Sequence, residues 1–337
     1  MMRFMKHQKV RVVAMADFIW KLIEITIIIA LLIPLAAMLV WVERRMIGIW
    51  QDRYGPNRVG PAGVLQSVAD LLKILGKEDW IPPFSDKKAF TVAPIIGAVC
   101  VLMSFAVVPF SPNIGVSNLN IGLLFFLAMA SLAVYSVVLA GWASNSKYAL
   151  LGGMRAAAQT VSYEVFMGLS VMGVVLLTGT FNLREIVLAQ QDGWHISSQF
   201  VGFFVFLVAG IAESHRLPFD LPEAETELTA GFHTEYSGLK FALFFLGEYL
   251  GVTLISAMSV VLFFGGWLMP APLDSWLPPL AWFFLKVMAF VMFFILLRTS
   301  LPRPRFDQLL SFGWKVMLPV ALLNLVVTAA LALGGVL

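Results

Sequence analysis

The fold is decided by residues 213–236, ESHRLPFDLPEAETELTAGFHTEY, which interrupt a series of very apolar segments. Six acidic residues lie in these 24 positions, and Arg216 is the only arginine or lysine among them. The apolar run before the stretch, residues 200–212, makes about 20 Å of helix, whereas the hydrocarbon core of a bilayer is about 30 Å thick. A helix that spans at this point therefore carries Glu213, His215 and Arg216 into the depth of the membrane.

Ionisable side chains at that depth usually face a bundle interior or a water-filled cavity, and they often mark a route for ions or protons. Pro218 and Pro222 follow closely and break the helix, which leaves irregular backbone that only surrounding protein or cavity water can satisfy. The alternative interpretation is a surface loop with solvated acids, which the short preceding helix disfavours. We therefore expect a buried polar break within a membrane-spanning bundle.

Composition is that of a membrane protein throughout. Of the 337 residues, 60% are hydrophobic and 13% are charged, and the mean hydropathy is +0.87, whereas soluble domains carry about 25% charged residues. We expect an all-α, polytopic membrane protein with a single domain, residues 1–337, and about eight transmembrane helices. The expected spans are residues 20–42, 91–110, 121–142, 157–180, 199–215, 238–268, 279–299 and 312–334. The first run shows no cleavage site, so we expect it to be retained as a span.

The chain is not expected to hold a redox centre. Cys100, the only cysteine, lies in an apolar run and is typical of a small buried hydrophobe, which disfavours a disulfide or a cysteine-based metal site. No two histidines occupy opposed mid-membrane positions that would suit a haem, and no phosphate-binding or dinucleotide-binding motif is present. No internal repeat of the kind common in secondary transporters is visible.

Lysine and arginine are divided unequally between alternate loops. The loops after the second, fourth and sixth runs and the C-terminal tail together contain a single one, Arg184. Sixteen lie in the other set of segments, 43–90, 143–156, 216–240 and 298–315. The positive-inside rule assigns this second set to the cytoplasm. Residues 43–90 are then the first cytoplasmic loop, residues 213–240 form an acidic cytoplasmic loop, and both termini are periplasmic, against the five positive charges of the N-terminal segment.

An amphipathic helix is predicted within the first loop. Its apolar residues recur at helical spacing and are Val64, Leu65, Val68, Leu71, Leu72 and Leu75. Such a pattern predicts a helix that lies at the membrane interface. A helix packed on a soluble partner is an equally good interpretation, and the two are compatible.

Two further glutamates are expected near mid-membrane. Glu164 lies about 13 Å along its helix past Arg155, and Glu248 follows the start of the sixth run by about ten residues. Burial and neighbouring like charges raise carboxyl pKa values toward neutrality, so such a row can hold and pass protons. The alternative for Glu164 is a hydrogen bond that only holds helices together. Lys286 is expected either to neutralise one of these carboxylates or to form a structural ion pair.

Several ordered motifs resemble those of a known family. They are ERRMIGIWQDRYGPNRVGP at 43–61, KEDWIPP at 77–83, GMRAAAQTVSYE at 153–164, PFDLPEAE at 218–225, EYSG at 235–238 and LPRPR at 301–305. Together they cover essentially the whole chain and resemble the H subunits of bacterial NADH:quinone oxidoreductase, respiratory complex I. The relatives in membrane-bound hydrogenase and formate hydrogenlyase complexes work without quinone, and the long first motif and amphipathic helix favour the quinone enzyme.

The resemblance implies a subunit of a proton-pumping oxidoreductase, or translocase, in the bacterial cell inner membrane. This subunit would form part of the quinone-binding chamber and link quinone reduction to proton translocation through buried carboxylates. The implied partners are the other complex I subunits of the peripheral and membrane arms, quinone as substrate and the lipid bilayer, and no nucleic acid. Iron–sulfur clusters and FMN are expected on partner subunits, with no covalently bound cofactor here.

The resemblance also implies two groups of site residues, with no redox-catalytic residue and no metal ligand in this chain. The quinone chamber and its entrance would involve Arg44, Arg45, Arg53, Arg216, Asp220 and Phe232. The proton path would involve Glu164, Glu213, Glu223, Glu225, Glu227, Glu235 and Glu248.

Two other functions stay open from the residues alone. A stand-alone proton or cation transporter would use the same buried glutamates, although the missing repeat and the large loops suited to docking disfavour it. A purely structural anchor for a soluble redox module is the other alternative, in which the charges of Glu164 and Glu248 would not affect turnover or pumping.

Overall fold

The structure is a computed structural model that describes residues 2–223, 225–270 and 273–335, with side chains from residue 19 onward except those of residues 225 and 226. Within these ranges the regular structure is entirely helical. The longer helices are α1 (Met2–Trp50), α3 (Lys87–Ser104), α4 (Gly122–Ala143), α5 (Lys147–Thr178), α7 (Phe200–Glu213), α9 (Gly238–Phe263), α10 (Pro279–Ser300) and α12 (Leu318–Leu333). The shorter ones are α2 (Gln66–Gly76), α6 (Leu183–Leu188), α8 (Glu225–Leu228) and α11 (Phe306–Phe312).

The predicted polytopic all-α fold is confirmed. Within the described residues, seven helices are long and apolar enough to cross a membrane, and α7 is a shorter apolar helix at the place of the fifth expected span. The 14 residues of α7 rise about 21 Å, which agrees with the length argument from the sequence. The helix ends at Glu213 rather than at the predicted residue 215.

Two helices begin earlier than predicted. α1 begins at Met2 instead of residue 20, because the polar N-terminal residues include many good helix formers. α5 likewise begins at Lys147, ten residues before the predicted start. Its other end is a C-cap on Gly179, whose φ of 68° is the left-handed conformation that glycine adopts without strain.

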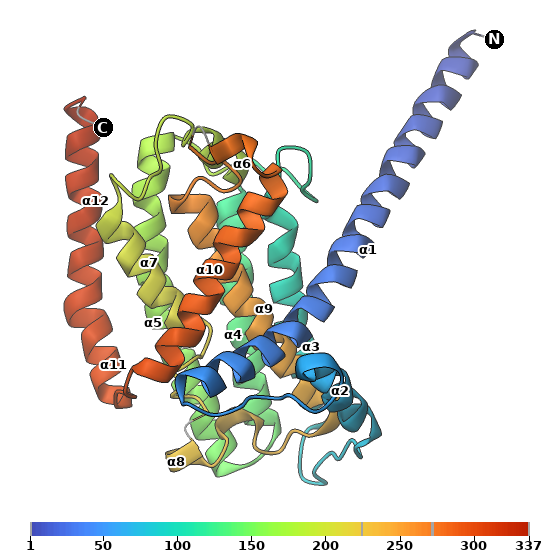
Figure 1. The fold of residues 1–337 in the computed structure, drawn as a ribbon, viewed down its shortest axis with the longest axis vertical. Helices are drawn as coiled ribbons and strands as arrows, with labels where there is room; N and C mark the ends of the chain where they lie inside the picture. The colour runs from blue at the N-terminus through green and yellow to red at the C-terminus, as the bar shows by residue number, and fades with distance from the viewer. Residues whose placement is uncertain (1, 224, 271–272, 336–337) are drawn as a thin grey trace.

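The bundle is built around α9 (Figure 1). In the most apolar 18-residue window of α9, 72% is buried inside the molecule. The corresponding windows of α1 and of the segment Phe306–Leu333, which contains α12, are only 17% buried. α9 packs against α1, α3, α7 and α10, while α5 packs against α4, α7 and α12. The helices that carry Glu43, Glu164 and Glu248 therefore all reach the interior of one bundle.

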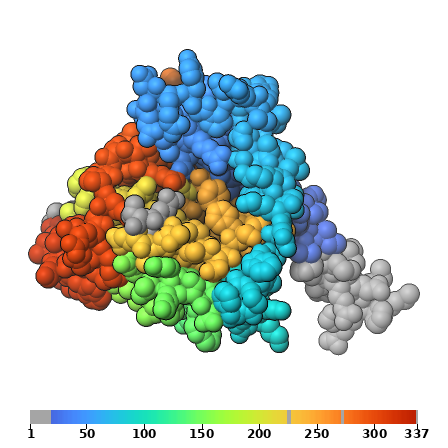
Figure 2. Space-filling view, turned by 90° about the horizontal axis from the view of Figure 1, so that it is seen from below, coloured from blue at the N-terminus to red at the C-terminus, as the bar shows by residue number. Residues whose placement is uncertain are grey.

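The first loop and the acidic stretch share one end of the molecule. Figure 1 shows α2, α8 and α11 at that end, and α6 with both chain termini at the other. Figure 2, viewed from below, shows the first loop lying beside the stretch around residue 240. Ser237 Oγ donates a hydrogen bond of 3.2 Å to the Glu78 carbonyl, and Lys240 pairs with Asp79.

α2 is the predicted amphipathic helix. Its apolar residues stay exposed on the described chain, with Leu72 64% and Leu75 54% accessible. The opposite side is tied to α1, because Asp70 pairs with Arg44 at 2.7 Å and Ser67 Oγ donates to the Ala37 carbonyl at 2.7 Å. An apolar face left open beside a membrane-spanning helix fits a position at the membrane interface.

Candidate functional site

The acidic stretch turns back into the bundle immediately after α7. Ser214 Oγ donates to the Ile211 carbonyl at 3.0 Å, and His215 adopts a φ of 52°, in the left-handed region. This turn directs the next side chain inward, so that Arg216 is only 6% exposed. A buried guanidinium needs anionic partners, because an unpaired charge in a low-dielectric interior is very unfavourable.

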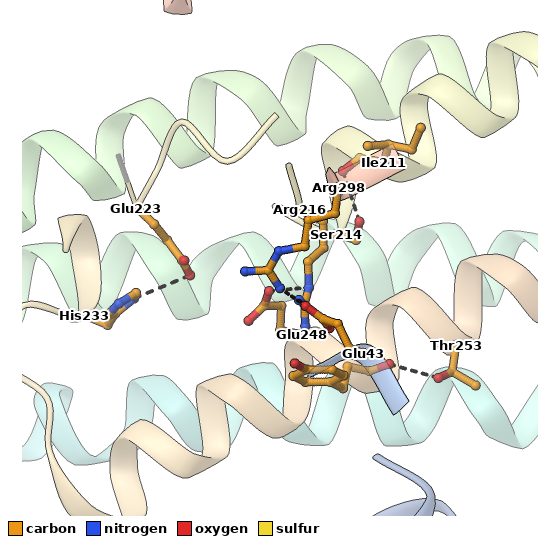
Figure 3. Close-up of polar contacts among 10 residues, drawn as sticks. Glu43, Ile211, Ser214, Arg216, Glu223, His233, Glu248, Thr253 and Arg298 are labelled. Atoms are coloured by element: carbon orange, nitrogen blue, oxygen red, sulfur yellow. Dashed lines mark hydrogen bonds and ion pairs between the residues drawn. The ribbon is translucent and has the colours of Figure 1, made fainter. Parts of the chain in front are cut away.

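Arg216 is the centre of a cluster of four charged side chains (Figure 3). Its Nη1 lies 3.2 and 3.1 Å from the two carboxyl oxygens of Glu43, and its Nε forms an ion pair with Glu248. Arg298 pairs with Glu43 from the other side. The cluster thus joins α1, α9, α10 and the acidic stretch with two positive and two negative charges. We call these four residues, Glu43, Arg216, Glu248 and Arg298, the arginine–glutamate cluster.

Tyr249 completes the surroundings of Arg216. The guanidinium carbon lies 4.1 Å from the centre of the Tyr249 ring, which is a cation–π contact. Burial by itself lowers the pKa of the Arg216 guanidinium, but the carboxylates of Glu248 and Glu43 outweigh it, and the pKa is raised above its ordinary value. Arg216 is therefore permanently charged and holds two carboxylates in place.

A cavity of about 470 Å³ lies beside the arginine–glutamate cluster. Much of its wall is apolar and comes from α3, α4 and α9, for instance Val101, Val134 and Phe244. The charged and titratable side chains on its wall are Glu43, Arg44, Cys100, Glu213, His215, Arg216, Glu223, His233, Glu248, Tyr249 and Arg298. An apolar chamber with convergent polar groups on one wall is the usual form of a small-molecule site.

Glu213 and Glu164 lie near each other on neighbouring helices. Glu213 Oε2 is buried and has no hydrogen-bond partner among the described residues, and its carboxyl group is close enough to Glu164 for their charges to repel. Glu164 itself accepts a hydrogen bond from Ser131 Oγ on α4. The two glutamates extend the row of carboxyl groups from the cavity toward α4 and α5.

Asp220 and Glu223 are buried acids on the acidic stretch. Burial raises the pKa of Asp220 to about 6, although Arg303 opposes the shift. Burial also raises the pKa of Glu223 well above its ordinary value, and the charges of Glu248 and Asp220 add to the effect. Burial therefore favours the protonated form of the Glu223 carboxyl, while Asp220, with a pKa of about 6, is mostly ionised at neutral pH.

The chain was compared with known proteins. A family model described as NADH dehydrogenase matches residues 23–329. The chain belongs to the NADH dehydrogenase family. It is also 67% identical over 299 residues to the H subunit of the NADH-quinone oxidoreductase of Methylococcus capsulatus, an alignment that covers 89% of this chain and 93% of that protein. The resemblance seen in the sequence is thereby confirmed, and the chain is a membrane subunit of the NADH-quinone oxidoreductase type.

The structure brings some of the expected site residues together at the cavity. Those that line the cavity are Arg44, Arg216, Phe232, Glu213, Glu223 and Glu248. Asp220 and Glu164 do not line the cavity, but their charges act on Glu223 and Glu213 respectively. The side chain of Glu225 lies outside the described residues, and its backbone begins α8.

Other expected site residues lie away from the cavity. Glu227 pairs with Arg155 at 2.6 Å near the surface. Arg45 donates to the Pro56 carbonyl at 3.5 Å, and Arg53 Nε donates to Gln51 Oε1 at 2.9 Å, both within the first loop. Glu235 is partly buried on the acidic stretch and does not line the cavity.

Several residues of the site were not assigned a role from the sequence. Glu43 and Arg298 stand at the ends of apolar runs, where a charge ordinarily faces the membrane surface. His215 was expected only to enter the depth of the membrane, and His233 was considered only as an unsuitable haem ligand. The one feature of the sequence that could have indicated them is that charged residues cluster at the helix ends assigned to the cytoplasmic side. Lys286 corrects an expectation: its Nζ donates to the carbonyls of Phe264, Gly266 and Leu268 at 2.7, 3.1 and 2.5 Å. It caps the end of α9 instead of neutralising a carboxylate.

His215 and His233 make the folded chain sensitive to acid. Burial lowers the pKa of both imidazoles to about 4 from an ordinary 6.5, so the unfolded chain takes up protons before the folded one does. Above pH 6.5 the imidazoles are neutral in both the folded and the unfolded chain, and they do not lower the free energy of unfolding. As the pH falls from 6.5 to 4, the free energy of unfolding decreases by up to about 3 kcal/mol for each histidine.

We expect the Tm of the purified protein to fall between pH 6.5 and 4, and to fall less in the His215→Asn variant. Asparagine tolerates the left-handed backbone of position 215, so the variant removes one titrating group without new strain. Thermal unfolding followed by circular dichroism in detergent at several pH values measures both slopes. An equal or steeper slope in the variant contradicts the prediction.

Proposed function

We propose that the chain forms part of the quinone-binding chamber of a proton-pumping NADH-quinone oxidoreductase and links quinone reduction to proton translocation through buried carboxyl groups. The observation that carries the proposal is the cavity of about 470 Å³, whose wall is largely apolar where α3 and α4 contribute and also carries Glu213, Glu223 and Glu248. The apolar part of the wall would hold the ring and tail of a quinone, and the carboxyl groups would supply the protons that its reduction needs.

The reaction consumes two electrons and two protons for each quinone that becomes quinol. Electrons would come from iron–sulfur clusters and FMN on partner subunits of the peripheral arm. Protons would come through this chain, since burial raises the pKa of Glu223 and favours its protonated form. When negative charge develops on the quinone, a neighbouring carboxyl group that loses its proton alters the field on the arginine–glutamate cluster, and Glu213 and Glu164 extend this response into the membrane arm.

The proposal retains the two groups of residues that the family resemblance implies. Arg44, Arg45 and Arg53 would border the chamber entrance together with α2, while Arg216, Asp220 and Phe232 would line or support the chamber. Glu164, Glu213, Glu223 and Glu248 would form the inner part of the proton path. Glu225, Glu227 and Glu235 would form its outer part, toward the partner subunits.

The proposed location is the bacterial inner membrane, with the whole chain as one membrane domain. Residues 43–90 and 213–240 would face the cytoplasm as the first loop and the acidic loop, with both termini periplasmic. The excess of lysine and arginine in these loops supports this orientation, and so does the position of both termini at the end opposite α2 and α8 (Figure 1).

The Glu223→Gln variant should lower quinone-reductase turnover at least tenfold in the assembled complex. The amide keeps the shape of the side chain but cannot release a proton, and positioned acid–base groups contribute about 10²- to 10⁴-fold to rate. Turnover and protons translocated per electron are measured in membrane vesicles. Glu185→Gln is the matched control, because Glu185 is an exposed glutamate on α6 at the far end of the molecule. Wild-type turnover and pumping in Glu223→Gln would count against the proposed path.

Photo-crosslinking tests the chamber itself. An azido-quinone is irradiated with purified membranes, and the labelled peptide is mapped with and without excess quinone. We expect label within residues 43–80 or 213–240 that excess quinone removes. Full activity without competable label in this chain would favour a structural anchor, and transport by the isolated chain would favour a transporter.

A further inference from the structure

His233 faces Glu223 across a short distance on the cavity wall. Its Nδ1 lies 3.6 Å from Glu223 Oε1 (Figure 3), and both residues line the cavity. We propose that His233 exchanges a proton with Glu223 and so adds an imidazole to the proton path. This inference rests on the proposed function, because it assigns a further residue to the same path.

The contact between the two segments is built into the backbone. Gly231 has a φ of 57° and lies so close to the chain ahead of it that an added Cβ would overlap the Pro222 oxygen and lie 3.1 Å from the Glu223 Cα. Only glycine allows both this conformation and this approach. The turn that carries His233 is therefore pressed against the residue that carries the carboxyl group.

The imidazole is held by aromatic neighbours. The ring centre of His233 lies 4.9 Å from that of Phe232 and 5.5 Å from that of Phe241, both in edge-to-face geometry. The turn also rests directly on α5, because an added Cβ at Gly152 would be 2.6 Å from the Phe232 nitrogen. Packing from two sides restricts the ring and keeps Nδ1 directed at Glu223.

Charged groups of both signs act on Glu223: Glu248 and Asp220 raise the pKa of its carboxyl group, and Arg216 and Arg298 lower it. The four members of the arginine–glutamate cluster, from α1, α9, α10 and the acidic stretch, neutralise one another. Arg44 of α1 pairs with Asp70. Glu213 Oε2 and His215 Nδ1 are buried without a hydrogen-bond partner among the described residues. α4 and α5 contribute Val137 and Thr160 to this wall, which are not ionisable.

The transfer conserves every proton. Burial raises the pKa of Glu223 and so favours its protonated form, and burial lowers the pKa of His233 to about 4, so the imidazole is a neutral acceptor at neutral pH. The Glu223 O–H bond breaks and an N–H bond forms at His233 Nδ1, which converts two neutral groups into a carboxylate and an imidazolium. The imidazolium then gives a proton to an acceptor in the cavity, and the carboxylate is reprotonated from the other carboxyl groups of the proposed path.

The His233→Asn variant is the first test. The asparagine oxygen can accept a hydrogen bond near the position of Nδ1 but does not take up a proton in the relevant pH range. We expect an assembled complex whose quinone-reductase turnover is about tenfold lower, with a pH profile that no longer declines toward acid pH. His195→Asn is the matched control, because His195 is a buried histidine on the loop before α7 and outside the proposed path. Its turnover and pH profile should match those of the wild type.

Chemical rescue separates proton transfer from packing. In His233→Ala, free imidazole can enter the vacated space, and we expect it to restore turnover of the detergent-solubilised complex, normalised to the amount assembled. The same imidazole should not change the wild type or His195→Asn. If His233→Asn assembles poorly, this response decides the question, and a lack of rescue overturns the proposal.

The experiments can overturn the role of His233 and the proposed proton path separately. Impaired Glu223→Gln together with a wild-type His233→Asn, pH profile included, overturns the role of His233 and leaves the proposed function. Wild-type behaviour of both variants overturns both. In the double variant we expect turnover no lower than in the slower single variant, since the two residues act as one unit. Losses that multiply would show that they act independently and overturn the exchange.

Discussion

Replacing Arg216 with methionine should prevent accumulation of the assembled, active complex. The substitution leaves Glu43 and Glu248 buried beside each other without the guanidinium that separates them. Breaking a buried ion pair by removing one partner costs about 3–5 kcal/mol, which is a large part of the stability of most folded proteins. The loss is measured as the amount of complex on native gels and as the Tm of the purified chain.

Arg305→Met is the matched control for this prediction. Arg305 pairs with Asp307 at 3.2 Å, but their side chains are 77% and 68% exposed, and exposed pairs contribute about 0–1 kcal/mol. We expect wild-type assembly in this variant. Adding Glu248→Gln to Arg216→Met should recover part of the lost stability, since it removes one of the two unpaired carboxylates. Normal Tm and assembly of Arg216→Met alone would contradict the assigned role of the cluster.

Gly231→Ala should disrupt the acidic stretch nearly as strongly. The new Cβ would overlap the Pro222 oxygen, and the φ of 57° is unfavourable for alanine. Backbone strain and overpacking each cost about 1–3 kcal/mol, and relief of the clash must move Glu223 away from His233. We expect lower Tm together with a loss of quinone-reductase turnover of at least tenfold.

Gly168→Ala tests whether any added methyl group has this effect. Gly168 lies within α5, and an added Cβ there meets no described atom within 4 Å. Glycine in a helix interior is less favourable than alanine by about 1 kcal/mol, so this variant should be as stable as the wild type or slightly more so. Turnover in Gly231→Ala that equals turnover in Gly168→Ala would show that the close approach at Pro222 is not needed.

The membrane fold could be predicted because its causes are local. Long apolar runs must be helical in a bilayer, since every backbone polar group needs a partner within its own segment. The short run before Glu213 predicted a polar break in the bundle, and α7 does end at Glu213. Helix starts were less predictable, because the first residues of α1 and α5 lie outside the predicted apolar runs and still belong to the helix.

The candidate site could be predicted only in part. Glu213 and Glu248 were expected to be buried, because Glu213 ends an apolar run and Glu248 lies within one, whereas Glu223 was expected at the site only from the family resemblance; all three line the cavity. Glu227 belongs to the same acidic stretch and yet pairs with Arg155 near the surface. Nothing in the spacing of the stretch separates these acids, since the chain there is irregular and has no period that would assign a face.

The sequence by itself determined the membrane class, the helical spans, the amphipathic α2 and the family of this protein, because hydrophobic length, periodicity and ordered motifs are read along the chain. Only the tertiary structure decided which charges meet. Glu43 and Arg298 are 255 positions apart and join Arg216 and Glu248 where four elements cross. Their pairing depends on how the helices pack, because a buried charge takes whichever opposite charge the packed bundle places beside it.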